Sequence, residues 1–171
     1  MVATAALGIG SNLGDRLAHL QAAIDALAAT DGVEIFAVSG VYETDPVGGP
    51  EQDKFLNAVV LVESAIEVEA LLRRCQAIEA ERNRVREVRW GPRTLDIDIL
   101  VYGEMASDDA SLTLPHPRAA ERAFVLVPWR DVEPNRQVAG LGSVSELAGS
   151  VDSSGVRPRA DLLLSVPRSV R

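Results

Sequence analysis

The order of the apolar segments in the first hundred residues constrains the fold of this chain more than any other feature of its sequence. Segments rich in β-branched residues alternate with segments in which leucine and isoleucine recur at helical spacing. Turn-forming Gly, Pro, Asn and Asp separate them. The predicted elements are a strand at residues 4–10, a helix to about residue 29, strands at 33–44 and 55–64, a helix at 68–82 and a strand within TLDIDILVYG.

This order of strand, helix, strand, strand, helix, strand is typical of a ferredoxin-like α+β sandwich, in which two helices cover one face of the sheet. The other face must be covered by something else or must form a site. Ser64 and Glu67 fit a capping box at the start of the second helix. Residues 105–171 are less regular and indicate additional short strands and helices, with SVSELAGS as one small helix. We expect residues 1–171 to form a single domain.

Composition and charge exclude several classes of protein. The chain is 47% hydrophobic and 25% charged, which is typical of a globular domain. A net charge of −8 argues against a general nucleic-acid binder. A single cysteine, Cys75, excludes an internal disulfide and a multi-cysteine metal site. We see neither a signal peptide nor an apolar run near the roughly 20 residues that span a bilayer, so we expect a cytoplasmic protein without a membrane partner. We also expect a monomer.

Two aspartates in the last predicted strand need an explanation. In TLDIDIL, Asp96 and Asp98 point to one face of the strand while Ile97 and Ile99 point to the other. Burying two unpaired carboxylates would be costly. Two carboxylates on one strand face can hold a hard divalent cation such as Mg²⁺, which completes its coordination with water and phosphate oxygens. The alternative is a solvated strand face, and an isolated Asp-x-Asp pair would favour it.

An arginine cluster precedes this strand. Arginine is suited to phosphate because its planar guanidinium donates paired hydrogen bonds and stays charged. Sixteen of the 17 basic residues are arginine, so a solvated basic loop is the competing interpretation. The neighbouring acidic strand favours a triphosphate carried on Mg²⁺, which requires both signs of charge. The cluster consists of Arg82, Arg84, Arg86, Arg89 and Arg93.

A third acidic residue, Glu79, lies on the apolar stripe of the 68–82 helix with Val68, Leu72 and Cys75. A carboxylate near a helix C-terminus is electrostatically unfavourable. Glu79 either pairs with a neighbouring arginine or belongs to the same cleft as the two aspartates.

Aromatic residues are only 4% of the chain, so their placement is informative. Phe55 and Phe124 each border a loop, and Asn57 shares a strand face with Phe55. Two rings and an amide can hold a flat heterocycle by stacking and edge recognition. The alternative is that both are ordinary core phenylalanines. His116, between two prolines, and Arg122 could contact phosphate, although many such loops are structural.

Four segments together resemble the 6-hydroxymethyl-7,8-dihydropterin pyrophosphokinase family: LGIGSNLGDR, VYETDPVGGPEQDKFLNAVV, RWGPRTLDIDIL and LTLPHPRAAERAFVLVP. They occur in this order from about residue 5 to residue 134. The resemblance implies a ferredoxin-like fold and an enzyme of folate biosynthesis. It implies transfer of the diphosphate of ATP to the pterin hydroxymethyl group, which yields the pterin diphosphate and AMP. The tail after residue 150 has no clear counterpart.

The same resemblance implies roles for individual residues. Asp96 and Asp98 would bind two Mg²⁺ ions and, with Arg84 and Arg93, carry catalysis. Segments 45–54 and 83–92 match mobile lids. The implied pterin site is Thr44, Pro46, Val47, Phe55, Asn57, Trp90 and Phe124. The implied ATP site is Gln76, Glu79, Arg86, Arg89, Arg93, Ile99, Thr113, His116 and Arg122.

Two other classes of function remain open at this point. A ferredoxin-like RNA-binding module would use aromatic residues on the sheet and a basic face, and the acidic strand and the net charge argue against it. A non-catalytic nucleotide- or metabolite-binding domain would bind the same ligands without forming AMP.

Overall fold

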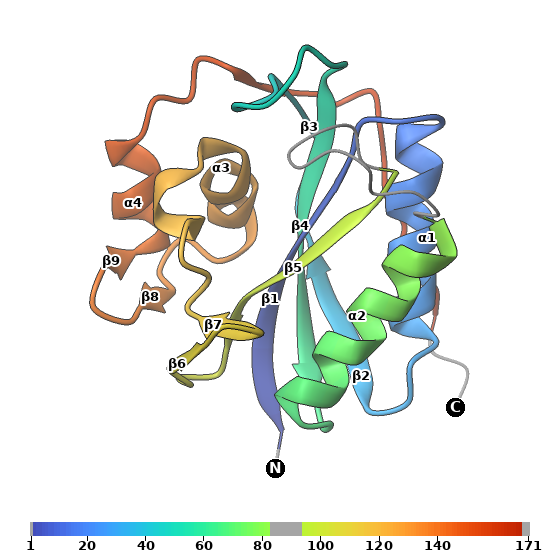
Figure 1. Ribbon diagram of the computed structural model, residues 1–171, viewed down its shortest axis with the longest axis vertical. Coiled ribbons are helices and arrows are strands. Elements are labelled where there is room, and N and C mark those ends of the chain that lie inside the picture. The colour runs from blue at the N-terminus through green and yellow to red at the C-terminus, as the bar shows by residue number, and fades with distance from the viewer. Residues whose placement is uncertain (1, 83–93, 169–171) are drawn as a thin grey trace.

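A six-stranded antiparallel sheet lies at the centre of the molecule (Figure 1). The computed structural model describes residues 2–82 and 94–168. The strand order is β10-β3-β4-β1-β5, and β2 also pairs with β4. The strands are β1 (Ala3–Ser11), β2 (Val33–Val38), β3 (Tyr42–Thr44), β4 (Phe55–Ser64), β5 (Asp96–Tyr102) and β10 (Val156–Pro158).

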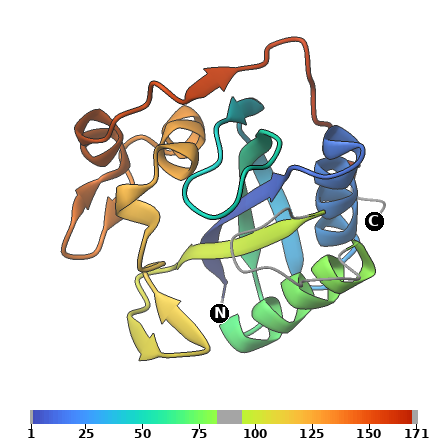
Figure 2. The ribbon, with the colours of Figure 1, turned by 45° about the horizontal axis from the view of Figure 1, so that its top comes forward.

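Helices cover both faces of the sheet, as Figures 1 and 2 show. The first two lie on one face in the arrangement expected of a ferredoxin-like fold, and the last two lie on the other face. The helices are α1 (Arg16–Ala28), α2 (Val68–Arg82), α3 (Ala123–Val132) and α4 (Val144–Ser150), with a short 3₁₀ helix at Ala119–Glu121. Two small hairpins complete the chain, β6 (Ser107–Asp109) with β7 (Leu112–Leu114) and β8 (Gln137–Val138) with β9 (Gly142–Ser143).

The two faces of the sheet bury two separate cores. Alternate residues of β1, including Leu7 and Ile9, pack with leucines and isoleucines of α1 and α2. On the opposite face, Leu100 of β5 packs with Leu126 and Trp129 of α3. Burying one such side chain contributes about 1.5–3 kcal/mol, so both helix layers are fixed firmly to the sheet.

The predicted strand at 33–44 is two strands. β2 pairs with residues 60–64 of β4, and β3 pairs with residues 55–57. Ser39 lies between them, and its backbone N–H donates to the Val59 carbonyl while its hydroxyl accepts from the Val59 N–H. The side-chain hydrogen bond replaces part of the ladder, which allows the chain to bend around Gly40 before pairing resumes.

The start of the second helix also differs from expectation. The capping box at Ser64 and Glu67 is wrong, because Ser64 is the last residue of β4 and its hydroxyl donates to the Ile66 carbonyl. The first helix begins at Arg16, where the Asp15 carboxylate accepts from the Ala18 N–H. Leu13 therefore precedes the helix and is exposed.

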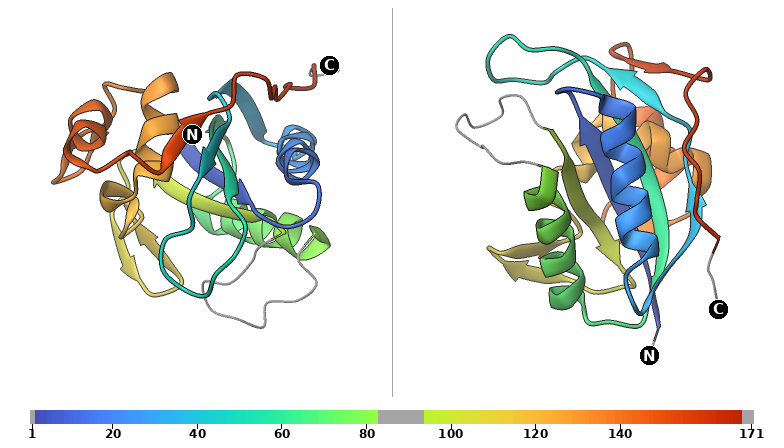
Figure 3. Two further views of the ribbon diagram at one scale, coloured as in Figure 1. Left: turned by 90° about the horizontal axis from the view of Figure 1, so that it is seen from above. Right: turned by 90° about the vertical axis from the view of Figure 1, so that its right-hand side faces the viewer.

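The C-terminal segment adds the short strand β10 to the sheet edge and then runs alongside α1 (Figure 3). Ser165 and Gln21 exchange hydrogen bonds of 2.9 and 2.7 Å there. Leu162 and Leu164 pack against the core beneath α1 and α2. Among the helices that the structure describes, none is long and apolar enough to cross a bilayer.

Candidate active site

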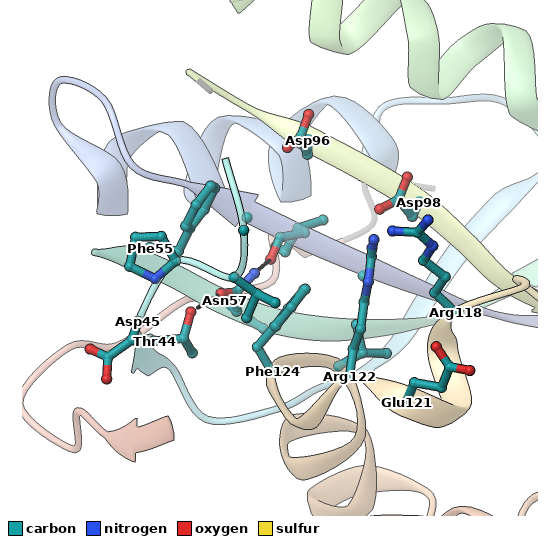
Figure 4. Close-up of a pocket in the computed structure, with 18 of the residues that line it drawn as sticks. Thr44, Asp45, Phe55, Asn57, Asp96, Asp98, Arg118, Glu121, Arg122 and Phe124 are labelled. Atoms are coloured by element: carbon teal, nitrogen blue, oxygen red, sulfur yellow. Dashed lines mark hydrogen bonds between the residues drawn. The ribbon is translucent and has the colours of Figure 1, made fainter. Parts of the chain in front are cut away.

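A cavity of about 570 Å³ opens on the α3 side of the sheet (Figure 4). Strands β1, β3, β4 and β5 contribute to its walls, together with the loop after β3 and the start of α3. The cavity thus occupies part of the second sheet face, while α3 and α4 cover the rest. Its polar and aromatic lining includes Thr44, Asp45, Gln52, Phe55, Asn57, Asp96, Asp98, Arg118, Glu121, Arg122 and Phe124.

One end of the cavity is formed by aromatic rings and an amide. Phe55 begins β4 and Phe124 lies in the first turn of α3, and Figure 4 shows Asn57 between them. The Asn57 Oδ1 accepts a 2.6 Å hydrogen bond from the Thr44 hydroxyl, and its Nδ2 donates to the Ile9 carbonyl at 3.5 Å. Both ends of the amide thus have protein partners, which favours one orientation of the side chain at the cavity wall.

The predicted pterin residues are brought together by this fold. Six of the seven line the cavity: Thr44, Pro46, Val47, Phe55, Asn57 and Phe124. The seventh, Trp90, lies outside the described residues. Their roles in binding stay predictions, and the fold brings both rings and the amide to one cavity.

The other end of the cavity is acidic. Asp96 and Asp98 line it from β5, whereas Ile97 and Ile99 are buried against the α1 and α2 side, so the predicted two-faced strand is confirmed. The antiparallel register between β5 and β1 places a glycine opposite each aspartate. Gly10 lies across from Asp96, and Gly8 lies across from Asp98. The two glycines add no side chain of their own beside the carboxylates, and the Asn57 amide occupies the space next to Gly10.

Two arginines border the acidic end. Figure 4 shows Arg118 and Arg122 directed toward Asp98. Burial lowers the pKa of the Arg122 guanidinium, and the charge of Asp98 opposes that shift. The Arg122 guanidinium carbon also lies 5.5 Å from the centroid of the Phe124 ring, within reach of a cation–π interaction. Arg122 therefore lies between the aromatic and acidic ends of the cavity.

His116 lies close to this arginine pair without lining the cavity. The His116 backbone N–H donates to the Leu100 carbonyl at 2.9 Å, which attaches the turn to β5. Its Nδ1 accepts from the Arg118 N–H at 3.3 Å. Burial lowers the pKa of His116 and Asp98 raises it, followed by smaller effects of Arg122 and Arg118 that lower it. The imidazole therefore contacts the backbone of Arg118, one of the two arginines.

Glu79 has a structural partner in β5. Its Oε2 accepts a 3.1 Å hydrogen bond from the Ile97 N–H, on the edge of the strand that β1 does not cover. Ile97 separates the two aspartates, so this hydrogen bond fixes the strand between them. The carboxylate on the apolar stripe of α2 is thereby explained by a backbone contact next to the site.

Five of the described residues predicted for ATP do not line the cavity: Glu79 and His116, whose contacts are given above, and Gln76, Ile99 and Thr113. Gln76 is exposed on α2, and Ile99 is buried in the core on the opposite sheet face. Thr113 lies in β7, where its hydroxyl donates to the Asp109 carbonyl at 3.0 Å. The roles predicted for these residues in ATP binding stay predictions. Arg84, Arg86, Arg89 and Arg93 lie outside the described residues.

Sequence reasoning missed several residues that line the cavity, chiefly Gly8, Gly10 and Arg118. Arg118 precedes Arg122 by four residues in PRAAER, but an isolated arginine is weak evidence in a chain with so many. The glycines are recognisable only from the β1–β5 register, which places them opposite the aspartates.

Comparison with known proteins identifies the family. The sequence model for 7,8-dihydro-6-hydroxymethylpterin-pyrophosphokinase (HPPK) matches residues 6–134. The chain belongs to the HPPK family. An HPPK relative from Methylorubrum extorquens, named 2-amino-4-hydroxy-6-hydroxymethyldihydropteridine pyrophosphokinase, is 45% identical over 150 residues, covering 88% of this chain and 94% of the relative. A Bacillus subtilis protein of the same name is 44% identical over 126 residues, 74% of this chain and 75% of the relative.

Solved structures confirm the ferredoxin-like fold at low sequence identity. An HPPK-DHPS structure from Plasmodium falciparum, described as A437G with SDX-DHP, has a TM-score of 0.70 at 15% identity. The match covers 87% of this chain and 45% of that chain, so the chain spans less than half of that protein. A second HPPK-DHPS structure, in complex with substrates, gives a TM-score of 0.68 at 13% identity over 88% of this chain and 43% of the other.

Proposed function

We propose that this cavity is where the chain, as an HPPK pyrophosphokinase of folate biosynthesis, transfers the diphosphate of ATP to 6-hydroxymethyl-7,8-dihydropterin. One observation carries the proposal. A clamp suited to a flat heterocycle and an acidic pair suited to a metal-bound triphosphate line a single cavity of about 570 Å³. Both reactants can therefore meet within one site, which is what a direct transfer requires.

The aromatic end is the proposed pterin site. Phe55 and Phe124 stack on the two faces of the bicyclic ring, and Asn57 reads its hydrogen-bonding edge. The Thr44 hydroxyl keeps the Asn57 amide in one orientation, so the edge pattern is selected before the substrate arrives. Phe124 also carries the Arg122 guanidinium above its ring, which places a positive charge where the pterin approaches the phosphates.

Asp96 and Asp98 are the proposed ligands of two Mg²⁺ ions. Their oxygens are the hard donors that Mg²⁺ prefers, and both carboxylates line the cavity, where water and phosphate oxygens can complete the coordination. Within residues 2–82 and 94–168, no three His, Cys, Asp or Glu side chains gather into a metal site. Two carboxylates suit Mg²⁺, which takes the rest of its ligands from water and substrate phosphate. When bound, the ions would neutralise phosphate charge.

The residues of the chain orient the transfer. The hydroxymethyl oxygen attacks the β-phosphorus in line and releases its proton to solvent, a new O–P bond forms, and the bond to the oxygen retained by AMP breaks. Arg118 and Arg122, together with the proposed Arg84 and Arg93, stabilise the charge on the phosphate oxygens. Most of the rate acceleration therefore comes from positioning and electrostatics.

The decisive test is formation of AMP. Purified protein is mixed with ATP, Mg²⁺ and 6-hydroxymethyl-7,8-dihydropterin, and AMP is measured against a control without the pterin. The proposal predicts pterin-dependent AMP. A non-catalytic binding domain would bind pterin and ATP without producing AMP above that control.

We also propose that residues 1–171 act as one domain, as a monomer in the cytoplasm, with no nucleic-acid partner. The return of the C-terminal segment onto β3 and α1 supports the single domain. Sedimentation at micromolar concentration tests the monomer.

A further inference from the structure

The C-terminal segment, residues 155–165, borders the loop on the pterin side of the cavity. This loop, residues 45–54, follows β3, and β10 pairs with β3 so that Val156 lies opposite Thr44. Beyond the paired residues, the Asp45 N–H donates to the Gly155 carbonyl at 2.9 Å. The start of the 45–54 loop is thus attached to the C-terminal segment by its backbone.

A forked ion pair reinforces this attachment. The Arg157 Nη2 lies 2.8 Å from the Asp45 Oδ1, and its Nη1 lies 3.5 Å from the other carboxylate oxygen. The same guanidinium lowers the pKa of the Asp45 carboxyl, which keeps it charged. Figure 4 shows the Asp45 carboxylate turned away from the rings of Phe55 and Phe124. Asp45 therefore borders the cavity with its backbone while its side chain serves the ion pair.

Asp45 is one residue from the group that orients the pterin clamp. Thr44 precedes it directly, is buried, and donates through its hydroxyl to Asn57. A shift of the peptide between Thr44 and Asp45 would move the hydroxyl and release the Asn57 amide. Arg157 is thus connected to the Asn57 amide through its ion pair with Asp45, the peptide bond between Asp45 and Thr44, and the hydrogen bond from Thr44 to Asn57.

The far end of the 45–54 loop is held by the same sheet edge. Glu43 accepts from Arg159 of the C-terminal segment at 3.1 Å and from Arg16 at 3.0 Å. The Arg16 guanidinium also donates to the Lys54 carbonyl at 3.0 Å, where the loop ends. The end of the loop at Lys54 is therefore connected to the C-terminal segment indirectly, through Arg16 and Glu43.

We propose that Arg157 is a positioning residue for the pterin substrate, which fixes the start of the 45–54 loop through Asp45 and so holds Thr44 and Asn57 in their binding geometry. The inference rests on the proposed function of the cavity. The Arg157 and Asp45 side chains are 42% and 50% exposed, and exposed pairs contribute little to global stability. Removal of this ion pair should therefore change the KM for the pterin more than the free energy of unfolding.

The test compares Arg157→Ala, Asp45→Ala and the double variant with wild type. Each single variant should raise the KM for the pterin by about two- to fivefold, the range open to an exposed ion pair, with kcat and the KM for ATP unchanged. The double variant should be no worse than either single one, because the two residues act as a pair. Arg157→Lys should restore most of the loss. The matched control is Arg168→Ala, an exposed arginine of the same tail.

A substitution at Gly155 tests the position of the Asp45 carboxylate independently of Arg157. A Cβ on Gly155 would lie 3.1 Å from the Asp45 Oδ2, so Gly155→Ala should also raise the pterin KM. Arg157→Ala kinetics equal to wild type would overturn the inference. The inference would also be overturned if Arg157→Ala lowered kcat and the urea midpoint and raised both KM values to a similar extent, because that pattern indicates general destabilisation of the protein. If wild type forms no AMP, the proposed function fails, and the inference is then decided by the Kd for 6-hydroxymethylpterin in the same variants.

Discussion

Gly10 of β1 and Asn57 of β4 are paired across the sheet, and the Asn57 amide occupies the space that a side chain at position 10 would fill. A Cβ on Gly10 would lie 2.6 Å from the Asn57 Nδ2, closer than van der Waals contact allows. Glycine at position 10 is therefore a requirement of the proposed pterin clamp, and the same residue lies opposite Asp96 at the acidic end.

Gly10→Ala should displace the Asn57 amide and weaken pterin binding. Loss of one such hydrogen bond corresponds to about 1 kcal/mol, so we expect the pterin Kd to rise by about five- to tenfold in calorimetric titrations. The matched control is Gly8→Ala on the same strand face. Its Cβ would meet Leu100 at an ordinary 3.6 Å, and its pterin Kd should stay within about twofold of wild type. Equal effects of the two substitutions would contradict the assignment.

Phe124→Ala should separate the two substrates. Removal of the ring deletes one face of the stack, and we expect the pterin Kd to rise at least about tenfold while the ATP Kd changes by less than about threefold. Phe36→Ala is the control, because Phe36 is 50% exposed on β2 and does not line the cavity. An equal loss of ATP and pterin affinity at position 124 would argue against the stacking role.

Tyr42→Phe tests how β3 is attached to α3. The Tyr42 hydroxyl donates to the Asp131 carboxylate at 2.6 Å, and burial together with this hydrogen bond raises the pKa of Tyr42 to about 12 from its usual 10.0. Between these values the unfolded chain loses the proton while the folded protein keeps it, so the contribution to stability is complete below pH 10 and declines as the pH rises toward 12.

Urea unfolding at pH 8 and at pH 11 measures this contribution. At pH 8 we expect Tyr42→Phe to unfold more easily by about 1 kcal/mol, and at pH 11 the difference from wild type should shrink. All other titrating groups are common to both proteins, so the change in the difference reports Tyr42. A difference that is equal at the two pH values would contradict the raised pKa.

Elements with strong local patterns were predictable from sequence. The strand at residues 55–64 and the helix at 68–82 occur with the predicted bounds. In these two segments the apolar residues that the sequence pattern marks as buried are also the residues that the structure buries, so local periodicity is sufficient to predict them. Asp96 and Asp98 were identified for the same reason, because two charges on one side of an otherwise apolar strand are conspicuous.

Elements that depend on distant partners were not predictable. The break at Ser39 depends on hydrogen bonds to Val59, twenty residues away. β10 is only three residues long and forms because β3 offers an open edge. Tertiary pairing of this kind overrides local propensity. The same limit applies to the site, where the roles of Gly8 and Gly10 follow only from strand register.

The proposed site of transfer depends on the acidic pair, Asp96 and Asp98. Its decisive test is AMP formation by variants that remove the charge of either aspartate. Asp96→Asn and Asp98→Asn keep side-chain size but remove the charge proposed to hold Mg²⁺. The control is Asp152→Asn, in an exposed turn after α4. We predict that each substitution in the pair lowers pterin-dependent AMP formation by at least about 100-fold, while the pterin Kd stays within about twofold of wild type. AMP formation within about threefold of wild type in both variants would contradict the assignment of this cavity as the site of transfer.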